Sequence, residues 1–281
     1  MKKILAALFL LPALLLAAPR PGQAQSLSVG VVPQQSAAEM AKGWVPLLAY
    51  LGERTGLRLH FETAKDIPTF EKRLAKGEYD IAYMNPYHYV VFHAAPGYNA
   101  FAREKDRKIQ GFIVVPKNSA ASRLEDLAGL TIAFPAPAAF AATILPLAHL
   151  KAQGVTVKPN FTSSHDSVYL SVSRGFFPAG GGINRTFENI PQEVRANLRI
   201  LWKSPFYTPH AVAAHPKLQP ALVRKLLAAM TALDSDPRGR ELLAGIGFKG
   251  FEEGRDADWN DIRKLGIHML ENLNRDIAGA P

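Results

Sequence analysis

The stretch LSVGVVPQQSAAEMAKGWVPLLAYLGERTGLRLHFET (residues 27–63) decides the fold class. Its first six residues are rich in valine and alternate in character, which predicts a strand. An apolar pattern with helical period follows over residues 37–55, and Gly56 ends it. Residues 57–63 then predict a second strand. A strand, a helix and a strand in this order predict a parallel pair of strands covered by a helix.

The same alternation of strands and helices continues toward the C-terminus. Residues 67–76 predict a second helix, which ends at Gly77, and residues 79–84 predict a third strand. This β-α-β-α-β order is typical of a parallel sheet with helices on its faces. Residues 101–103 and 110–115 then indicate a hairpin-like pair of strands around a charged turn.

A second β-α-β-α-β pattern occupies about residues 117–200, and the rest of the chain is largely helical. The expected elements of this second pattern are a short helix at 124–127, strands at 131–134 and 155–161, helices at 138–153 and 168–173, and a glycine-rich segment at 179–183. Beyond it we expect strands at 198–202 and 210–215, and helices at 222–233, 238–243 and 259–274. Two α/β units in series predict two lobes with a cleft between them.

The helical tail must cover apolar surface, and packing it on the first lobe makes that lobe discontinuous. We therefore predict lobe one from residues 25–115 and 206–281, and lobe two from residues 116–205. Ligands of open α/β sheets bind at the carboxyl ends of the strands. In two lobes that face each other those ends line the cleft, so we expect the binding site there.

The first 24 residues have the composition of a cleaved secretory signal (residues 1–24). Two lysines precede an uncharged run rich in Leu and Ala at residues 4–18, and Gly22 and Ala24 offer small side chains at the two positions that a signal peptidase reads. A membrane span needs about 20 apolar residues, so cleavage after Ala24 is favoured over anchoring. We expect a protein of the periplasm.

The composition excludes several classes of protein. A hydrophobic fraction of 48% supports a packed core. The absence of cysteine excludes disulfides, thiolate metal sites and a cysteine nucleophile, and the histidines lack metal-binding spacing, so no metal or cofactor is expected. Without the three basic residues of the signal segment, the formal charge of +9 becomes +6. The basic residues are scattered and do not predict a nucleic-acid groove.

Six phrases occur in a fixed order along the chain. They are LSVGVVPQQSAAEM (27–40), VPLLAYLGERTG (45–56), LAKGEYDIAYMNPYHYV (74–90), NSAASRLEDLAGLTIAF (118–134), SSHDSVYLSVSRG (163–175) and ILWKSPFYTPHAVAAHP (200–216). Together they resemble the phosphate/phosphite/phosphonate substrate-binding proteins of ABC transporters, which are type 2 periplasmic binding proteins. The resemblance covers nearly all of the chain after residue 24.

The resemblance implies a two-lobed α/β receptor, each lobe a mixed sheet flanked by helices, that closes over a small anionic ligand. It also implies a monomer that needs no cofactor and delivers its ligand to an ABC permease. Two alternatives stay open: a ligand-sensing partner of a membrane histidine kinase, and a receptor for a non-phosphorus organic anion. The lack of HExxH and G-x-S-x-G motifs argues against an enzyme.

The resemblance places the oxyanion at the helix start after the first strand of lobe two. The family pattern there is close to Asp-Pro-x-Ser-x-Ser-Gly, whereas this chain has APAAFAA at residues 136–142, without a hydroxyl. Backbone N–H groups at a helix N-terminus still favour an anion. We therefore expect contacts from Ala139, Phe140 and Ala141, and the missing hydroxyls leave the ligand's identity open.

Two loops supply further candidates by the same resemblance. His165, after the second strand of lobe two, is expected to contact the ligand, and Asp166 to cap the following helix or orient the histidine. In lobe one, the loop after the third strand contributes Tyr87 and His88, which either face the cleft or lie at the surface.

The glycine-rich segment departs from the family pattern. Phe177 stands where the family has an acid, which disfavours an amino-phosphonate. The glycines at 180–182 let the backbone approach either a ligand or a neighbouring strand. Asn184 and Arg185 follow, and Arg185 either gives the anion a bidentate partner or lies at the surface.

The return to lobe one contributes Tyr207 and His210, which either reach the cleft or fill the hinge. Weaker candidates after the first strand are Gln34, Gln35 and Ser36. The expected pocket has fewer hydroxyls and more aromatic groups than the family pattern. The sequence therefore predicts a small oxyanion or organic anion as the ligand.

Overall fold

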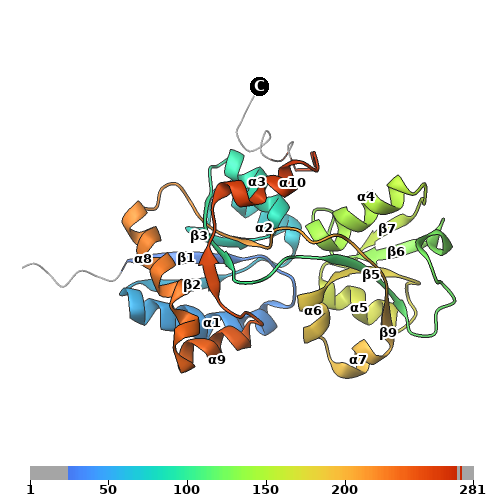
Figure 1. Ribbon diagram of the computed structural model, residues 1–281, viewed down its shortest axis with the longest axis horizontal. Coiled ribbons are helices and arrows are strands. Elements are labelled where there is room, and N and C mark those ends of the chain that lie inside the picture. The colour runs from blue at the N-terminus through green and yellow to red at the C-terminus, as the bar shows by residue number, and fades with distance from the viewer. Residues whose placement is uncertain (1–24, 271–272, 274–281) are drawn as a thin grey trace, which may run out of the picture.

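The structure, a computed structural model, describes residues 25–270 and 273. Two lobes lie side by side along the long axis, each with its own sheet and flanking helices (Figure 1). This arrangement confirms the predicted fold class. None of the helices formed by the described residues combines the length and the apolar character that crossing a membrane requires.

Lobe one contains a six-stranded sheet in the order β11-β4-β10-β3-β1-β2. Its strands are β1 (Ser26–Val31), β2 (Arg58–Glu62), β3 (Ile81–Met84), β4 (Asn99–Glu104), β10 (Ala211–Ala214) and β11 (Phe251–Glu253). β1 pairs in parallel with both β2 and β3, as the strand and helix order predicts. β10 runs antiparallel to β3 and β4, so the sheet is mixed.

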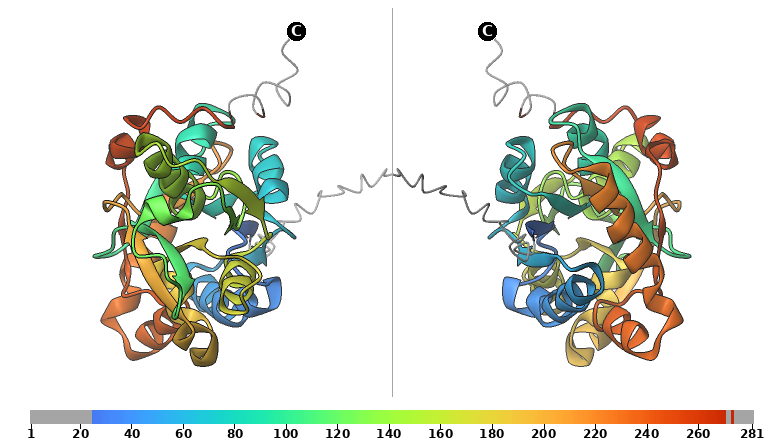
Figure 2. Two further views of the ribbon diagram at one scale, coloured as in Figure 1. Left: turned by 90° about the vertical axis from the view of Figure 1, so that its right-hand side faces the viewer. Right: turned by 90° about the vertical axis from the view of Figure 1, so that its left-hand side faces the viewer.

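Helices cover both faces of the lobe-one sheet. They are α1 (Ala37–Thr55), α2 (Ile67–Ala75), α3 (Pro86–Ala94), α8 (Pro220–Thr231), α9 (Pro237–Gly245) and α10 (Asn260–Arg263). α1 and α9 lie together on one side, and α2, α3 and α10 lie on the other (Figures 1 and 2). α1 starts at the N-cap Ser36 and ends at Gly56, whose φ of 66° is left-handed.

Lobe two contains a five-stranded sheet in the order β7-β6-β8-β5-β9. Its elements are β5 (Gly111–Pro116), β6 (Thr131–Phe134), α4 (Leu145–Ala152), β7 (Lys158–Phe161), α5 (His165–Ser173), β8 (Gly180–Ile183), α6 (Asn184–Asn189), α7 (Gln192–Ala196) and β9 (Leu198–Lys203). β6 is parallel to β7 and β8, whereas β5 is antiparallel to β8 and β9. This sheet is also mixed.

Two crossing segments join the lobes. The expected hairpin of residues 101–103 with 110–115 is wrong, because β4 pairs with β10 and β11 in lobe one and β5 pairs with β8 and β9 in lobe two. The charged turn between them passes from one lobe to the other. The first crossing therefore lies between β4 and β5 rather than near residue 115. The backbones of Ile109 and Tyr207 pair where the two crossings meet.

The C-terminal tail is less helical than its sequence predicts. The strand β11 was missed, because three residues are too few to show alternation. The helix expected at 259–274 is a 3-10 turn (Asp256–Trp259) followed by the short α10. Gly266, with a φ of 59°, then turns the chain away from helical geometry. Residues 271, 272 and 274 of that expected helix lie outside the described residues.

Candidate functional site

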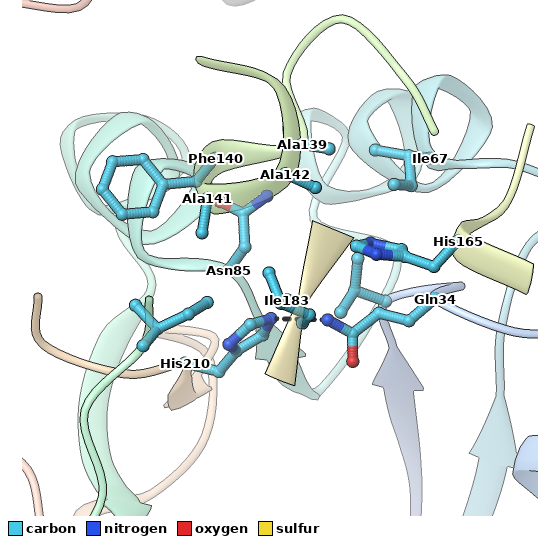
Figure 3. Close-up of a pocket in the computed structure, with 12 residues that line it drawn as sticks. Gln34, Ile67, Asn85, Ala139, Phe140, Ala141, Ala142, His165, Ile183 and His210 are labelled. Atoms are coloured by element: carbon cyan, nitrogen blue, oxygen red, sulfur yellow. Dashed lines mark hydrogen bonds between the residues drawn. The ribbon is translucent and has the colours of Figure 1, made fainter. Parts of the chain in front are cut away.

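A small cavity lies between the two lobes (Figure 3). Lobe one and the crossings line it with Val32, Gln34, Ile67, Asn85, Ile109 and His210, and lobe two lines it with Ala139, Phe140, Ala141, Ala142, His165 and Ile183. Val32 follows β1, Asn85 follows β3, and Ile183 ends β8. The cavity therefore lies at the carboxyl ends of strands from both sheets, where the topology predicts a ligand.

The size of the cavity limits the ligand. The centre of a water-sized sphere can occupy about 20 Å³ inside it, and about 10–15 Å³ of such space holds a single water. The cavity therefore has room for about one or two waters, which limits it to a small ligand.

The lobe-two wall of the cavity is the start of a helix with an unusual first turn. The sequence predicts one regular helix over 138–153, but the structure has the π-helix η2 (Phe140–Ile144), which continues directly into α4. The N–H groups of Thr143 and Ile144 both donate to the carbonyl of Ala139, at 2.8 and 3.3 Å. A widened turn of this kind is frequent at functional sites.

Three backbone N–H groups at this turn have no acceptor. Those of Phe140, Ala141 and Ala142 precede the first bonds of the helix, and no described residue accepts from them. Ala139 lines the cavity, but its N–H donates to the carbonyl of Ala136 at 3.3 Å. The predicted set of donors, residues 139–141, is therefore corrected by one position to residues 140–142.

Glycines allow the helix backbone to lie directly on the lobe-two sheet. A Cβ on Gly181 would lie 1.9 Å from the carbonyl oxygen of Ala142, and one on Gly111 would lie 1.8 Å from that of Ala141. Real Cβ atoms do not approach backbone oxygens so closely. Gly181 thus serves the approach of the helix backbone to the sheet, one of the two interpretations that the sequence left open.

His165 lies at the cavity wall as the first residue of α5. Its backbone N–H donates to the carbonyl of Gln34 across the cleft at 3.2 Å. Its Nδ1 lies 3.3 Å from the Thr186 hydroxyl, which also contacts the Tyr169 hydroxyl at 2.8 Å. Burial lowers the pKa of His165 to about 3. The imidazole is therefore neutral in the closed protein.

Gln34 and His210 form the opposite wall. The Gln34 Nε2 lies 3.1 Å from the His210 Nε2, and the His210 ring stacks on Tyr83 with centroids 4.9 Å apart. Burial, and after it the charge of Arg185, lowers the pKa of His210 well below its usual range. With both histidines neutral, the residues that line the cavity carry no full charge.

Asn85 lines the cavity, whereas the sequence indicated Tyr87 and His88 of the same loop as candidates for this position. It is the N-cap of α3: its Oδ1 accepts from the His88 N–H at 2.8 Å, and its Nδ2 donates to the Ala138 carbonyl across the cleft at 3.1 Å. Asn followed by Pro is the sequence signal of such a cap.

Tyr87 and His88 do not line the cavity. The first turn of α3 places both in the lobe-one interior, where the Tyr87 hydroxyl accepts from the Leu270 N–H at 2.9 Å. The His88 Nε2 lies 2.9 Å from Oε1 of the buried Glu71. Neither expected position, at the cleft or at the surface, is therefore right, because both side chains are buried behind Asn85.

Asp166 also lies away from the cavity lining. It does not cap α5, because Ser164 is the N-cap and accepts from the Ser167 N–H. Burial raises the pKa of the Asp166 carboxyl, and its Oδ1 is buried without a hydrogen-bond partner among the described residues.

The remaining candidates surround the cavity without lining it. Tyr207 packs edge-on against Phe140, with ring centroids 5.6 Å apart. Asn184 and Arg185 line a neighbouring groove, and the Arg185 guanidinium donates to Glu104 and to the Tyr83 hydroxyl of lobe one. The guanidinium of Arg185 is therefore engaged by a carboxylate and a hydroxyl of lobe one, and its side chain lies neither on the cavity wall nor at the surface.

Comparison with known proteins gives this geometry a family. The family model described as "ABC transporter, phosphonate, periplasmic substrate-binding protein" matches residues 29–259. The chain belongs to this family. Its members are substrate-binding proteins of transporters, so the family is one of transport proteins and not of enzymes. The sensor role and the non-phosphorus ligand are not favoured.

Individual relatives agree with the family. The chain is 24% identical to "Phosphate-import protein PhnD" of Mycolicibacterium smegmatis over 91% of its own length and 84% of the relative. Its fold is similar to that of PhnD1 from Prochlorococcus marinus in complex with methylphosphonate (TM-score 0.79, 19% identity, 86% of this chain and 97% of that one). A binding protein component of an ABC phosphonate transporter from Pseudomonas aeruginosa is similar too (TM-score 0.80, 17% identity, 91% and 96%).

Proposed function

We propose that this protein captures a small tetrahedral oxyanion with one apolar side, of the phosphonate or phosphite kind, in the cavity between its lobes. The observation that carries the proposal is the set of three unbonded N–H groups at Phe140, Ala141 and Ala142 in a cavity that is otherwise largely apolar. The captured anion is then handed to an ABC permease.

The helix start supplies the attraction for the anion. Free N–H groups and the positive end of the helix dipole favour an oxyanion without any cationic side chain. η2 and α4 form one continuous helical segment over residues 140–152, so the dipole is that of several turns. Gln34, His165 and His210 add neutral polar groups around the same space. These backbone groups replace the hydroxyls that the family pattern supplies.

The apolar walls decide between related anions. Val32, Ile67, Ile109 and Ile183 line the cavity together with the alanines. An oxygen turned toward these side chains lacks a donor, whereas a methyl group or a hydrogen on phosphorus does not need one. An unsatisfied polar group of this kind costs about 1–3 kcal/mol, so the site favours methylphosphonate or phosphite over phosphate.

Export and partners complete the proposal. The signal-like composition of residues 1–24 supports cleavage after Ala24 and release into the periplasm. The site requires two lobes of one chain and no second copy, which supports a monomer that meets its permease after closure. The cavity lining contains no nucleophile with a general base beside it, which supports a binding role without catalysis.

Calorimetric titration in chloride buffer with methylphosphonate, phosphite, phosphate and sulfate tests the ligand. We expect methylphosphonate and phosphite to bind at least tenfold more tightly than phosphate, because neither presents a fourth oxygen to the apolar wall. Tighter binding of phosphate would contradict the role of that wall. Absence of heat from all four anions would contradict the oxyanion itself.

A further inference from the structure

Arg185 forms a buried charged link between the two lobes. It belongs to α6 of lobe two, and its guanidinium donates to the Glu104 carboxylate on β4 and the Tyr83 hydroxyl on β3. Its Cζ lies 4.3 Å from the centre of the Phe248 ring. Glu104, Tyr83 and Phe248 all belong to lobe one, and we call these three residues the socket.

The socket is buried, whereas Arg185 enters it from the other lobe. The Glu104 side chain is 1% exposed and that of Arg185 is 14% exposed. Burial raises the pKa of Glu104, and the charge of Arg185 opposes this. An opening of the cleft that separates α6 from β3 and β4 must break all three contacts at once.

The residues on both sides of Arg185 belong to the cavity wall or support it. Ile183, two residues before it, lines the cavity. Thr186, the next residue, holds the His165 Nδ1 at 3.3 Å. The position of Arg185 in the socket therefore fixes where two parts of the lobe-two wall stand relative to the lobe-one wall.

We propose that Arg185 is a positioning residue for ligand capture: its insertion into the socket holds Ile183 and His165 over the cavity and sets how long the bound anion stays. Arg185 acts without touching the anion. The inference rests on the proposed function for the ligand, but its effect on closure does not require one.

The chemistry of the socket makes a cation necessary in the closed state. Removing one partner of a buried ion pair leaves the other charge buried and uncompensated, which is strongly unfavourable. Arg107 of the crossing segment lies farther from Glu104, with its Nε 3.7 Å from Oε1, and it also reaches Glu188 of α6 at 3.4 Å, so it compensates the Glu104 charge only in part. In the open state water reaches Glu104, so loss of Arg185 penalises the closed state specifically.

The test uses Arg185→Met, with Arg238→Met as the matched control. Arg238 lies on α9 in an exposed pair with Glu241, where its side chain is 61% exposed. The radius of gyration of the anion-free protein is measured by X-ray scattering, and the dissociation rate of methylphosphonate by stopped flow. We expect Arg185→Met to enlarge the radius and to raise the dissociation rate at least tenfold, whereas Arg238→Met changes neither.

Arg185→Lys separates positioning from simple stabilisation. A lysine keeps the charge but not the fork that reaches Glu104 and Tyr83 together, so we expect a dissociation rate between those of the wild type and Arg185→Met. A purely structural role predicts instead that the wild type, Arg185→Met and Arg185→Lys release methylphosphonate at the same rate and differ only in melting temperature.

Two further outcomes are decisive. An unchanged radius and an unchanged dissociation rate in Arg185→Met overturn the inference. If the wild type binds no methylphosphonate, the proposed ligand fails, and the radius of the anion-free variants still decides whether Arg185 holds the lobes together.

Discussion

The anion cavity and the Arg185 socket both join lobe one to lobe two, but they are built from opposite kinds of group. The cavity is lined by neutral amides, imidazoles and alkyl groups. In the socket, the Glu104 carboxylate and the inserted Arg185 guanidinium neutralise each other within the protein. If both proposals hold, the buried positive charge of this chain holds the lobes together, and backbone N–H groups recognise the anion.

The cavity wall depends on Gly181, and a side chain there is expected to have the largest effect. Gly181→Ala places a methyl group 1.9 Å from the Ala142 carbonyl oxygen, and both sides of this contact are backbone. We expect a loss of about 3 kcal/mol or more in the free energy of unfolding, measured by urea denaturation.

Gly245→Ala is the control for that experiment. Gly245 is the last residue of α9, and a Cβ there meets nothing within 4 Å. Alanine is a better helix former than glycine by about 1 kcal/mol, so the control should be as stable as the wild type or more so. Equal stability of the two variants would contradict the packing argument.

A charged side chain in the wall of the neutral cavity is expected to weaken anion binding. Asn85→Asp keeps an acceptor for the His88 N–H, so α3 stays capped, but it brings a carboxylate to the cavity wall. Repulsion of the anion should weaken methylphosphonate binding at least a hundredfold, or about 2.7 kcal/mol, by calorimetry. The exposed Asn260→Asp is the control and should bind normally.

Neutral histidine in the cavity predicts a dependence of stability on pH. The pKa of His165 is about 3 in the folded protein and about 6.5 when unfolded. Because the folded value is lower, stability is fully present above about pH 6.5 and is lost as the pH falls toward 3. At pH 5 the loss is up to about 2 kcal/mol.

Urea midpoints at pH 7.5 and pH 5 check this dependence in the wild type and in His165→Asn. We expect the variant to lose less stability between the two pH values, because asparagine does not titrate. Equal losses in both proteins would show that His165 is not held neutral.

The contribution of one backbone N–H is expected to be the smallest effect. Phe140→Pro removes the N–H at the first helical position, where proline fits and where the preceding Ala139 is already extended. Phe140→Ala removes the same ring but keeps the N–H. We expect Phe140→Pro to bind methylphosphonate about tenfold more weakly than Phe140→Ala, since a hydrogen bond to a charged group contributes about 1.5–3 kcal/mol. Equal affinities of the two variants would show that the N–H of residue 140 does not contribute to binding.

Much of the fold could be predicted from the sequence because it rests on local patterns. The apolar periodicity, together with the glycine that ends the helix, predicted the bounds of α1 and of the strands on either side to within a residue or two. The hairpin error had a different origin. β4 and β5 are close in sequence, but each pairs with strands from distant parts of the chain, and no local pattern carries that information.

The site was predictable in part, for a similar reason. The resemblance pointed to residues 139–141 and His165, which do line the cavity. It left Arg185 open between the anion and the surface, because sequence shows that a cation is present but not that Glu104 and Tyr83 lie opposite it. The shift of the free donors to residues 140–142 arises because the helix begins at Phe140 and the Ala139 N–H donates to the Ala136 carbonyl, which a pattern of alanines does not reveal.

A crystal structure of the protein with methylphosphonate tests the central claim most directly. We predict the phosphonate oxygens within hydrogen-bond distance of the N–H groups of Phe140, Ala141 and Ala142, with the methyl group toward Ile183 and with Arg185 still in its socket. A phosphonate bound to the Arg185 guanidinium, with Glu104 displaced, would contradict the account.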